Sequence, residues 1–317
     1  MVQALLKAEN ILLLCHVSPD GDTVGSVLAI ALALKKLGKN VTCACSDKIP
    51  DMLLFLKEAE QIQNPQAVQN GVYDLALAVD ISDAARMGDL LPVFKTVKTT
   101  CQIDHHCTNP LFAKINAVDG NACATGILAY ELINRLNVPL DMEMARCIYT
   151  AIATDTGNFS FDNTSAEAFS IMADLMAYPI HINAMNRILF RQRSRAQTKL
   201  LARALKSLEF YQDECVAGMT LSQYDFQKCG ALPEHSDAVV NFGIDTIGIQ
   251  VAFLARETAE GDVKISFRAL PPADVSAVAK AFGGGGHALA AGCTFSGTLP
   301  KAVEAVLKEI EKHLAEL

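Results

Sequence analysis

Six residues whose side chains commonly bind divalent metals occur in four separate segments of the chain. They are His16, Asp20, Asp22, Asp80, His105 and Asp155. This mixture of carboxylates and imidazoles suits Mn²⁺ better than the all-oxygen shells typical of Mg²⁺ or Ca²⁺. Because the set contains no thiolate, it argues against a structural zinc site. Two ions held in this way could activate water for phosphoryl hydrolysis.

The first segment runs from His16 to Asp22 and reads His-Val-Ser-Pro-Asp-Gly-Asp. Pro19 and Gly21 predict a turn directly after an apolar strand. Asp20 and Asp22 are two residues apart in that turn, so both carboxylates can point into one pocket. The alternative is an ordinary Asp-Gly turn with no ligand.

Two further carboxylates each end an apolar run. Asp80 follows residues 75–79, and its alternative role is to cap the next turn, although Asp83 could do this instead. Asp155 follows a helix of small residues, where a carboxylate needs a partner or a metal. Its alternative role is to cap the turn before Asn158.

The triplet Asp104-His105-His106 ends another predicted strand. Adjacent histidines point in different directions, so we expect one to bind a metal and the other to meet substrate. An Asp-His-His triplet at a strand end is more typical of a functional site than of a structural one.

A glycine run in the C-terminal third of the chain predicts an anion-binding backbone. Gly284, Gly285 and Gly286 precede His287, and Arg268 lies upstream on a predicted strand. Glycine allows close approach of backbone N–H groups to an anion, and arginine suits bidentate phosphate binding. The alternative is a flexible loop. The run is neither a Walker loop nor a dinucleotide fingerprint.

The elements that would position these residues alternate between strand and helix in the first half of the chain. Predicted strands cover residues 10–16, 41–45, 73–80 and 99–104, and predicted helices cover 24–37, 125–136 and 142–153. This alternation predicts an α/β fold with a mostly parallel sheet. The candidate ligands follow strand or helix ends, which is the edge where open α/β sheets bind ligands.

The length predicts two domains joined by a linker. We expect an N-terminal α/β domain at 1–184, a helical linker at 185–208 and a smaller α+β domain at 209–317, with strands near 216–221, 247–254 and 263–267 and a helix at 301–314. The linker carries Arg187, Arg191, Arg193, Arg195 and Lys199. These form either a solvated helix face or a substrate contact.

Composition narrows the class of protein. The chain has 317 residues, 51% of them hydrophobic, and a net charge of −8. No apolar stretch approaches the roughly 20 residues of a membrane helix. The ten scattered cysteines indicate reduced core thiols, so we expect a cytoplasmic protein. The negative charge argues against a surface that coats duplex nucleic acid and against an extended basic groove.

Together these motifs resemble the DHH phosphoesterase superfamily over nearly the whole chain. His16-x-x-Pro19-Asp20-x-Asp22, Asp80, the triplet and Asp155 match its four motifs in order, and the segment from Gly283 to Gly292 matches its C-terminal domain. The resemblance implies one metal on His16, Asp20 and Asp80. It implies a second on Asp22, His105 and Asp155, with Asp80 bridging.

The resemblance also implies the remaining roles. His106 would face the scissile phosphate, and Asp104 would orient a histidine of the triplet. Arg268 and His287 would hold a terminal phosphate of the substrate, with Arg86 as a weaker candidate for the same role.

The overall layout is most similar to the nanoRNase A group within this superfamily. This implies hydrolysis of short RNA oligonucleotides and of 3′-phosphoadenosine 5′-phosphate (pAp), with two divalent ions, Mn²⁺ first and Mg²⁺ or Co²⁺ as alternatives. A linear-dinucleotide (pApA) hydrolase of cyclic-di-AMP turnover and a non-catalytic nucleotide-binding regulator are the competing interpretations. The sequence leaves the oligomeric state open, with a homodimer among the options.

Overall fold

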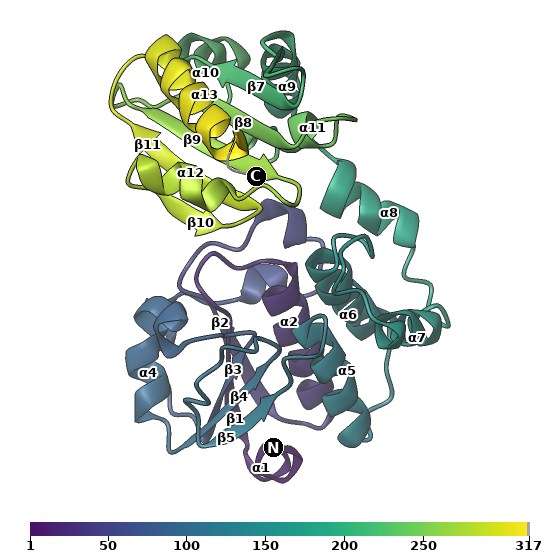
Figure 1. Cartoon of the computed structure of the whole chain (residues 1–317). Helices are drawn as coiled ribbons and strands as arrows, with labels where there is room; N and C mark the ends of the chain where they lie inside the picture. The colour runs from purple at the N-terminus through teal and green to yellow at the C-terminus, as the bar shows by residue number, and fades with distance from the viewer. Residues whose placement is uncertain (316–317) are drawn as a thin grey trace. The chain divides into compact units, whose positions relative to one another are not determined.

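The computed structural model describes residues 1–315 and divides into two compact units (Figure 1). Unit 1 covers Met1–Gln192 and unit 2 begins at Arg193. The predicted domain limits at 184 and 209 stay a prediction, since the division falls within the predicted linker. No helix among residues 1–315 combines the length and the apolar character needed to cross a bilayer. All ten cysteines are free, and eight of them are buried.

Unit 1 contains a five-stranded sheet in which every neighbouring pair is parallel, in the order β2-β1-β3-β4-β5. Its strands are β1 (Asn10–Leu14), β2 (Asn40–Ala44), β3 (Leu75–Val79), β4 (Thr99–Asp104) and β5 (Ile115–Val118). The predicted parallel α/β domain is confirmed. The chain moves outward from β1 to β2 and then returns to β3 on the other side of β1. The gap between β1 and β3 is therefore a topological switch point, where such sheets bind ligands.

Helices cover both faces of this sheet, as parallel strands require. Three helices, α2 (Gly21–Lys36), α5 (Thr125–Arg135) and α6 (Met142–Asp155), share one core with Ile11 and Leu13. On the other face Leu12 and Leu14 pack with residues of the 3₁₀ helix η3 (Ala84–Leu90) and of α4 (Leu91–Thr96). The remaining α-helices of unit 1 are α1 (Val2–Lys7), α3 (Pro65–Val68), α7 (Ala166–Leu175) and α8 (Ile182–Asn186), and two short 3₁₀ helices cover Asp51–Leu53 and Ala59–Gln61.

Small residues allow α2, α5 and α6 to pack closely. A Cβ atom at Gly25 would lie 2.5 Å from the carbonyl oxygen of Cys147, and one at Gly126 would lie 2.6 Å from Cβ of Ala151. Only glycine fits such contacts without moving the neighbouring helix. This packing brings the start of α2, which carries Asp22, next to the end of α6, which carries Asp155.

Unit 2 contains a mixed six-stranded sheet in the order β10-β11-β9-β8-β7-β6, in which only β7 and β8 pair in parallel. Its strands are β6 (Glu209–Tyr211), β7 (Val216–Leu221), β8 (Val251–Glu257), β9 (Val263–Ala269), β10 (Gly285–His287) and β11 (Ala290–Phe295). The predicted second α+β domain is confirmed.

Two helical layers enclose this second sheet. One face packs against α12 (Val275–Ala281) and α13 (Leu299–Ala315), with Phe253 and Phe267 at its centre. The other face packs against α9 (Arg195–Lys206), α10 (Gln223–Cys229) and α11 (Asn241–Ile244), with Met219 and Leu254 between them.

The predicted helical linker at residues 185–208 is largely helical but is interrupted at residues 192–194. The π-helical turn Arg187–Arg191 follows α8, and Gln192 then adopts an extended conformation. Ser194 begins α9 with a capping box, because its side chain and that of Gln197 each bind the other's backbone N–H. The glycine run, for which a flexible loop was one interpretation, is ordered in part as strand β10.

Candidate metal centre

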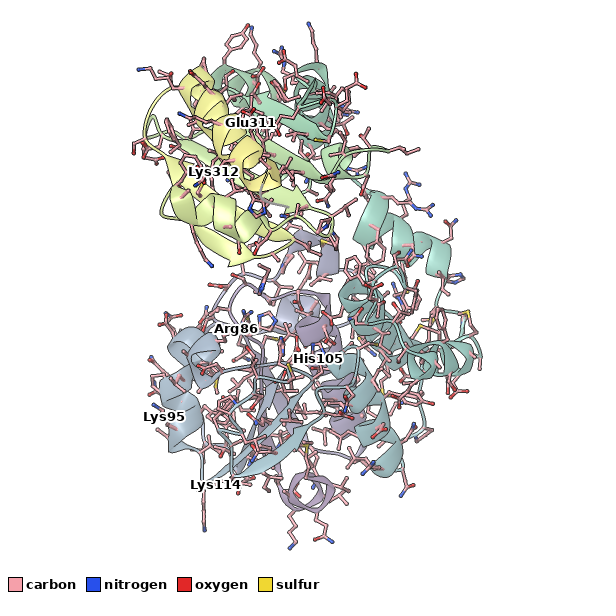
Figure 2. All side chains as sticks on the ribbon, viewed as in Figure 1. Arg86, Lys95, His105, Lys114, Glu311 and Lys312 are labelled. Atoms are coloured by element: carbon pink, nitrogen blue, oxygen red, sulfur yellow. The ribbon has the colours of Figure 1, made fainter. Side chains whose placement is uncertain are left out.

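The six predicted metal ligands all belong to unit 1 and gather at the carboxyl edge of its sheet. His16 follows β1, Asp80 follows β3 and His105 follows β4. Figure 2 shows His105 and Arg86 at this end of the sheet, whereas Lys114, just before β5, lies at the opposite end. His16 and Asp80 therefore flank the topological switch point.

One set of ligand atoms comes from His16, Asp20 and Asp80, and these atoms lie within 4.8 Å of one another. Nε2 of His16 is 3.6 Å from Oδ2 of Asp20 and 3.5 Å from Oδ2 of Asp80. The other ring nitrogen, Nδ1, lies 2.7 Å from the carbonyl oxygen of Val17. Because a carbonyl only accepts, the neutral tautomer that donates Nδ1–H to Val17 is the one that leaves the Nε2 lone pair facing the carboxylates.

Asp20 serves two purposes at once. Its Oδ1 accepts hydrogen bonds from the backbone N–H groups of Asp22 and Thr23, at 3.0 and 3.1 Å, and so caps α2. Its Oδ2 remains free to face His16. The turn interpretation and the ligand interpretation of the Asp-Gly-Asp segment are therefore compatible.

A second set of ligand atoms comes from Asp22, His105 and Asp155. Nε2 of His105 lies 3.8 Å from Oδ2 of Asp22 and 3.5 Å from Oδ2 of Asp155. Its Nδ1 lies 3.1 Å from the carbonyl oxygen of Ala122, which again leaves Nε2 as the free ligand atom.

Asp80 lies between the two sets. Its Oδ2 faces His16 at 3.5 Å, and its Oδ1 faces His105 at 3.7 Å. The residue has a left-handed backbone with φ of 61°, which turns the chain out of β3, and aspartate tolerates this conformation better than most residues. Thr125 Oγ1 donates a 2.8 Å hydrogen bond to Oδ1 and fixes the carboxylate. The turn is capped by Asp83, as predicted, through Ala85 N–H.

Asp22 is buried against the start of α5. Its two oxygens accept hydrogen bonds from the backbone N–H groups of Thr125 and Gly126, at 2.6 and 2.8 Å. A helix start has unpaired N–H groups and a partial positive charge, so it stabilises this carboxylate. Ala124, the residue before α5, cannot provide such a cap itself, and Asp22 supplies it from a distant part of the sequence.

Asp155 leaves the capping of its turn to a neighbour. Thr156 Oγ1 donates to the carbonyl oxygen of Ile152 and accepts from the N–H of Phe159. The carboxylate of Asp155 instead faces His105.

Asp104 orients His106. Its Oδ1 is 2.7 Å from Nδ1 of His106, and its Oδ2 accepts a 2.6 Å hydrogen bond from Nδ2 of Asn109. The side chain of His106 is 41% exposed, compared with 15% for His105. His106 is therefore the member of the triplet that can meet a substrate. Sequence reasoning missed Asn109 and Thr125, because both act through contacts that no local pattern reveals.

Burial and charge shift the pKa values of the first set. Burial disfavours the charged form of His16, but its hydrogen bonds with Asp20 and Asp80 outweigh this effect and raise the pKa to about 10. For Asp20, whose side chain is 56% exposed, partial desolvation favours the neutral acid, yet the contacts with His16 and two backbone N–H groups lower the pKa below its usual range. The first set thus attracts positive charge strongly.

The second set contains carboxylates that repel one another. Burial raises the pKa of Asp155 to about 6, against the opposing effect of His105, and the charge of Asp80 adds to the increase. Burial, followed by the charges of Asp80 and Asp155, raises the pKa of Asp22 well above its usual value. Such crowding of carboxylates is relieved by a bound cation. The donor atoms therefore fit divalent ions by chemistry and by geometry.

Arg86 lies beside the first set. Its Nη2 is 2.9 Å from Nδ1 of His16 and 3.3 Å from the carbonyl oxygen of Val17. The backbone carbonyl of Arg86 also accepts from Val17 N–H at 2.7 Å. A guanidinium at this position is close enough to the candidate ligands to contact a phosphate bound there.

The predicted phosphate-binding residues of unit 2 share one cross-strand row. Ala290 of β11 pairs with Arg268 of β9 on one side and with His287 of β10 on the other. Directly opposed residues of antiparallel strands project from the same face, so both side chains emerge together, about 10 Å apart at their Cα atoms.

The glycines before His287 differ in what they do. A Cβ atom at Gly284 would lie 2.3 Å from the carbonyl oxygen of Gly292, and Gly286 has φ of 145°. These two are needed for the pairing of β10 with β11. A Cβ atom at Gly285 would meet no other described atom within 4 Å. Anion binding by this run stays a prediction.

Both units match families of known proteins. Residues 10–152 match the DHH family, N-terminal domain, and residues 222–316 match the DHHA1 domain. The chain is 33% identical, over 99% of its length and 94% of the relative's, to the bifunctional oligoribonuclease and PAP phosphatase NrnA of Thermus thermophilus. It is 23% identical to the Bacillus subtilis protein of the same name, over 93% of this chain and 92% of that one.

A solved structure has a similar overall fold. The exopolyphosphatase-related protein from Bacteroides fragilis superposes with a TM-score of 0.86 and 26% identity, covering 98% of this chain and 94% of that one.

Proposed function

The chain belongs to the DHH phosphoesterase family and is a hydrolytic enzyme, and on this premise we propose that it hydrolyses short RNA oligonucleotides to nucleoside monophosphates and pAp to AMP. The observation that carries the proposal is the position of Asp80, whose two oxygens face His16 and His105 separately. The name of the Thermus relative supports the choice of substrates.

Two divalent ions, with Mn²⁺ as the expected metal, would bind in the two sets of ligand atoms. His16, Asp20 and Asp80 would hold one ion, and Asp22, His105 and Asp155 would hold the other with Asp80 as the shared ligand. When bound, such a pair supplies a nucleophilic hydroxide and neutralises charge on the phosphate.

The protein's own groups position the substrate. His106, kept in place by Asp104, would donate a hydrogen bond from Nε2 to the scissile phosphate. Arg86 would add a second positive contact near the first set. In unit 2, Arg268 and His287 would bind a terminal phosphate of the substrate. The substrate would then be bound at its end.

The experiment uses the full-length protein with Mn²⁺, Mg²⁺ or Co²⁺ and a set of substrates: pAp, pApA, RNA of three, five and fifteen nucleotides, and an RNA duplex. Products are separated by chromatography. We expect AMP from pAp, mononucleotides from short RNA and little cleavage of the duplex. Strong preference for pApA alone would replace the proposal with the linear-dinucleotide interpretation.

The matched variants are Asp80→Asn and Asp83→Asn. Asp80→Asn should abolish turnover while the circular dichroism spectrum is retained, because the shared ligand loses its charge. Asp83 lies three residues away and caps η3, a role that asparagine also fills, so Asp83→Asn should retain activity. Near-normal turnover in Asp80→Asn, or binding of nucleotides without turnover in the parent protein, would contradict the proposal.

We place this activity in the cytoplasm. The ten free cysteines, eight of them buried, are typical of a protein that folds in a reducing compartment.

A further inference from the structure

Unit 2 carries a groove of about 730 Å³ between α9 and α10, with Ser207 and Thr220 among the residues that line it. Its cations are Lys199, Arg203, Lys206 and Lys228. We call this feature the basic groove. Asp225 is the acidic residue that lines it, so positive charge dominates. The net charge of the chain had led us to expect no such groove.

The sequence of α9 explains the row of cations. Lys199, Arg203 and Lys206 are spaced by four and three residues, so they lie on one side of the helix. Leu200 and Ala204 occupy another side and are buried against the sheet. Residues 187–206 contain seven lysines and arginines and no aspartate or glutamate. The segment contains the predicted basic linker residues, for which a solvated helix face and a substrate contact were the two interpretations. They are Arg187, Arg191, Arg193, Arg195 and Lys199.

Local contacts hold two of the four cations, Arg203 and Lys228, in position. Nη1 of Arg203 is 2.8 Å from Oδ1 of Asp225, whose other oxygen is bound by Ser222 at the start of α10. Arg203 and Lys228 both lie over the ring of Tyr224, at 5.8 and 5.4 Å from its centroid. Such cation–π contacts restrict these side chains before a ligand binds, so less conformational entropy is lost on binding.

The shape and length of the row fit a strand better than a single phosphate. From Lys199 to Lys206 the helix rises about 10 Å. That length exceeds the axial spacing of successive phosphates in one strand of a duplex, about 3.4 Å, so the row can contact more than one phosphate. Tyr224, which is 58% exposed, contacts Arg203 and Lys228 of this row through its ring and so adds an aromatic side chain beside the cations.

We propose that the basic groove binds a single-stranded RNA segment beyond the nucleotides that are being hydrolysed. This inference rests on the proposed function and extends it to longer substrates. Within unit 2, α9 packs on the sheet face that includes Ala252, and Ala252 is paired with Arg268. Arg268 and the basic groove therefore belong to the same side of the sheet. A strand bound at its end by Arg268 could therefore reach the groove without crossing to the other face of the sheet.

The test compares two triple variants of the full-length protein. Lys199→Ala/Lys206→Ala/Lys228→Ala removes three charges from the basic groove. Lys301→Ala/Lys308→Ala/Lys312→Ala removes three charges from α13, on the other sheet face. Binding of fluorescein-labelled oligoadenylates of three and fifteen nucleotides is measured by anisotropy in EDTA, from 50 to 300 mM KCl. Inorganic polyphosphate serves as a competitor without sugars or bases.

We expect the groove variant to lose at least tenfold in affinity for the 15-mer at low salt, with a salt slope lower by about two. The α13 variant and the 3-mer should change less than threefold. Equal loss in both variants, or no loss in the groove variant, would overturn the inference. Stronger competition by polyphosphate than by unlabelled oligoadenylate would also overturn it, since the ligand would then not be RNA.

Hydrolysis of pAp with Mn²⁺, measured on the same three proteins, separates this inference from the proposed function. The groove variant should hydrolyse pAp at the parent rate, because pAp is too short to reach the groove. Failure of the parent protein to hydrolyse pAp or short RNA would count against the proposed function. The binding data in EDTA would still show whether the basic groove binds RNA.

Discussion

At the scale of residues, the candidate metal centre depends on the orientation of three imidazoles. His16 and His105 each place Nδ1 against a backbone carbonyl, from Val17 and Ala122 respectively, so both present Nε2 to carboxylates. His106 has Nδ1 against Asp104 instead. The hydrogen bond at Nδ1 thus orients His16 and His105 for metal binding and His106 for contact with a substrate.

This difference predicts separable effects within the triplet. His105→Ala should lower Mn²⁺ content, because it removes a ligand atom from the set with Asp22 and Asp155. His106→Ala should retain the metal and lower kcat by about 10²–10⁴-fold, as expected for a group that acts on the reacting phosphate. Elemental analysis after Mn²⁺ loading, combined with kcat for pAp, distinguishes them. Equal metal loss in both variants would contradict the division of roles.

The shifted pKa values predict how the metal-free protein responds to pH. Burial raises the pKa of Asp155 to about 6, so its effect lowers the stability as pH rises from about 4 to about 6. The pKa of His16 is raised to about 10, so its stabilising protonated form is present below pH 6.5 and is lost as the pH approaches 10. Both effects lower the stability as pH rises, whereas the lowered pKa of Asp20 affects stability only at acidic pH.

The melting temperature in EDTA should therefore fall between pH 5.5 and 9. The increase caused by Mn²⁺ should grow over the same range, because the metal replaces protons that leave as pH rises. Differential scanning fluorimetry with and without Mn²⁺ measures both. Asp155→Asn should flatten the EDTA profile below about pH 6, where the carboxyl of Asp155 titrates. A metal-free protein that became more stable with rising pH would show that the carboxylates are not crowded as described.

At the scale of elements, the sequence predicted best what depends on local pattern. Apolar runs ending in Asp80 and Asp104 predicted strands whose carboxyl ends carry ligands, and β3 and β4 have this form. Ser194 and Gln197 form a capping box whose sequence signal could have located the break before α9.

Other features depend on contacts between distant segments. The cap that Asp22 supplies to α5 joins residues 103 apart in sequence. The basic groove needs Lys228 of α10 beside α9, and a single sequence contains no record of that pairing.

The close approach of α2 and α6 gives a prediction at this scale. Gly25→Ala improves helix propensity by about 1 kcal/mol, so an exposed site would gain stability. Here the new methyl group would meet the carbonyl oxygen of Cys147 at 2.5 Å and push α6 away. We expect a net loss of about 1–3 kcal/mol in the free energy of unfolding. Urea denaturation measures this loss. An unchanged or higher stability would show that α6 can move aside without lowering the free energy of unfolding.

The same substitution should weaken the second metal more than the first. Asp155 ends α6, and it belongs to the set with Asp22 and His105, whereas His16 and Asp20 are not on that helix. Titration of Mn²⁺ followed by calorimetry should show one site with reduced affinity. Equal weakening of both sites would mean that the helix displacement reaches the whole edge of the sheet.

At the scale of the whole molecule, each unit has its own hydrophobic core. The candidate metal ligands belong to unit 1, and the predicted terminal-phosphate residues belong to unit 2. A change in unit 2 should therefore alter which substrates are hydrolysed well, without affecting the chemistry that the metal ligands support.

Arg268→Ala tests this division. If Arg268 binds a terminal phosphate, its loss should cost about 2–5 kcal/mol in kcat/KM for pAp and dinucleotides, as when a charged partner is removed from a bound anion. Bis-p-nitrophenyl phosphate has no terminal phosphate, so its hydrolysis should change little. Arg256→Ala is the matched control, since Arg256 is also a half-buried arginine on a central strand of the same sheet. The measurement is kcat/KM for each substrate in each protein. If Arg268→Ala lowered activity on the generic ester as much as on the dinucleotide, Arg268 would be a structural residue and substrate length would have to be set elsewhere.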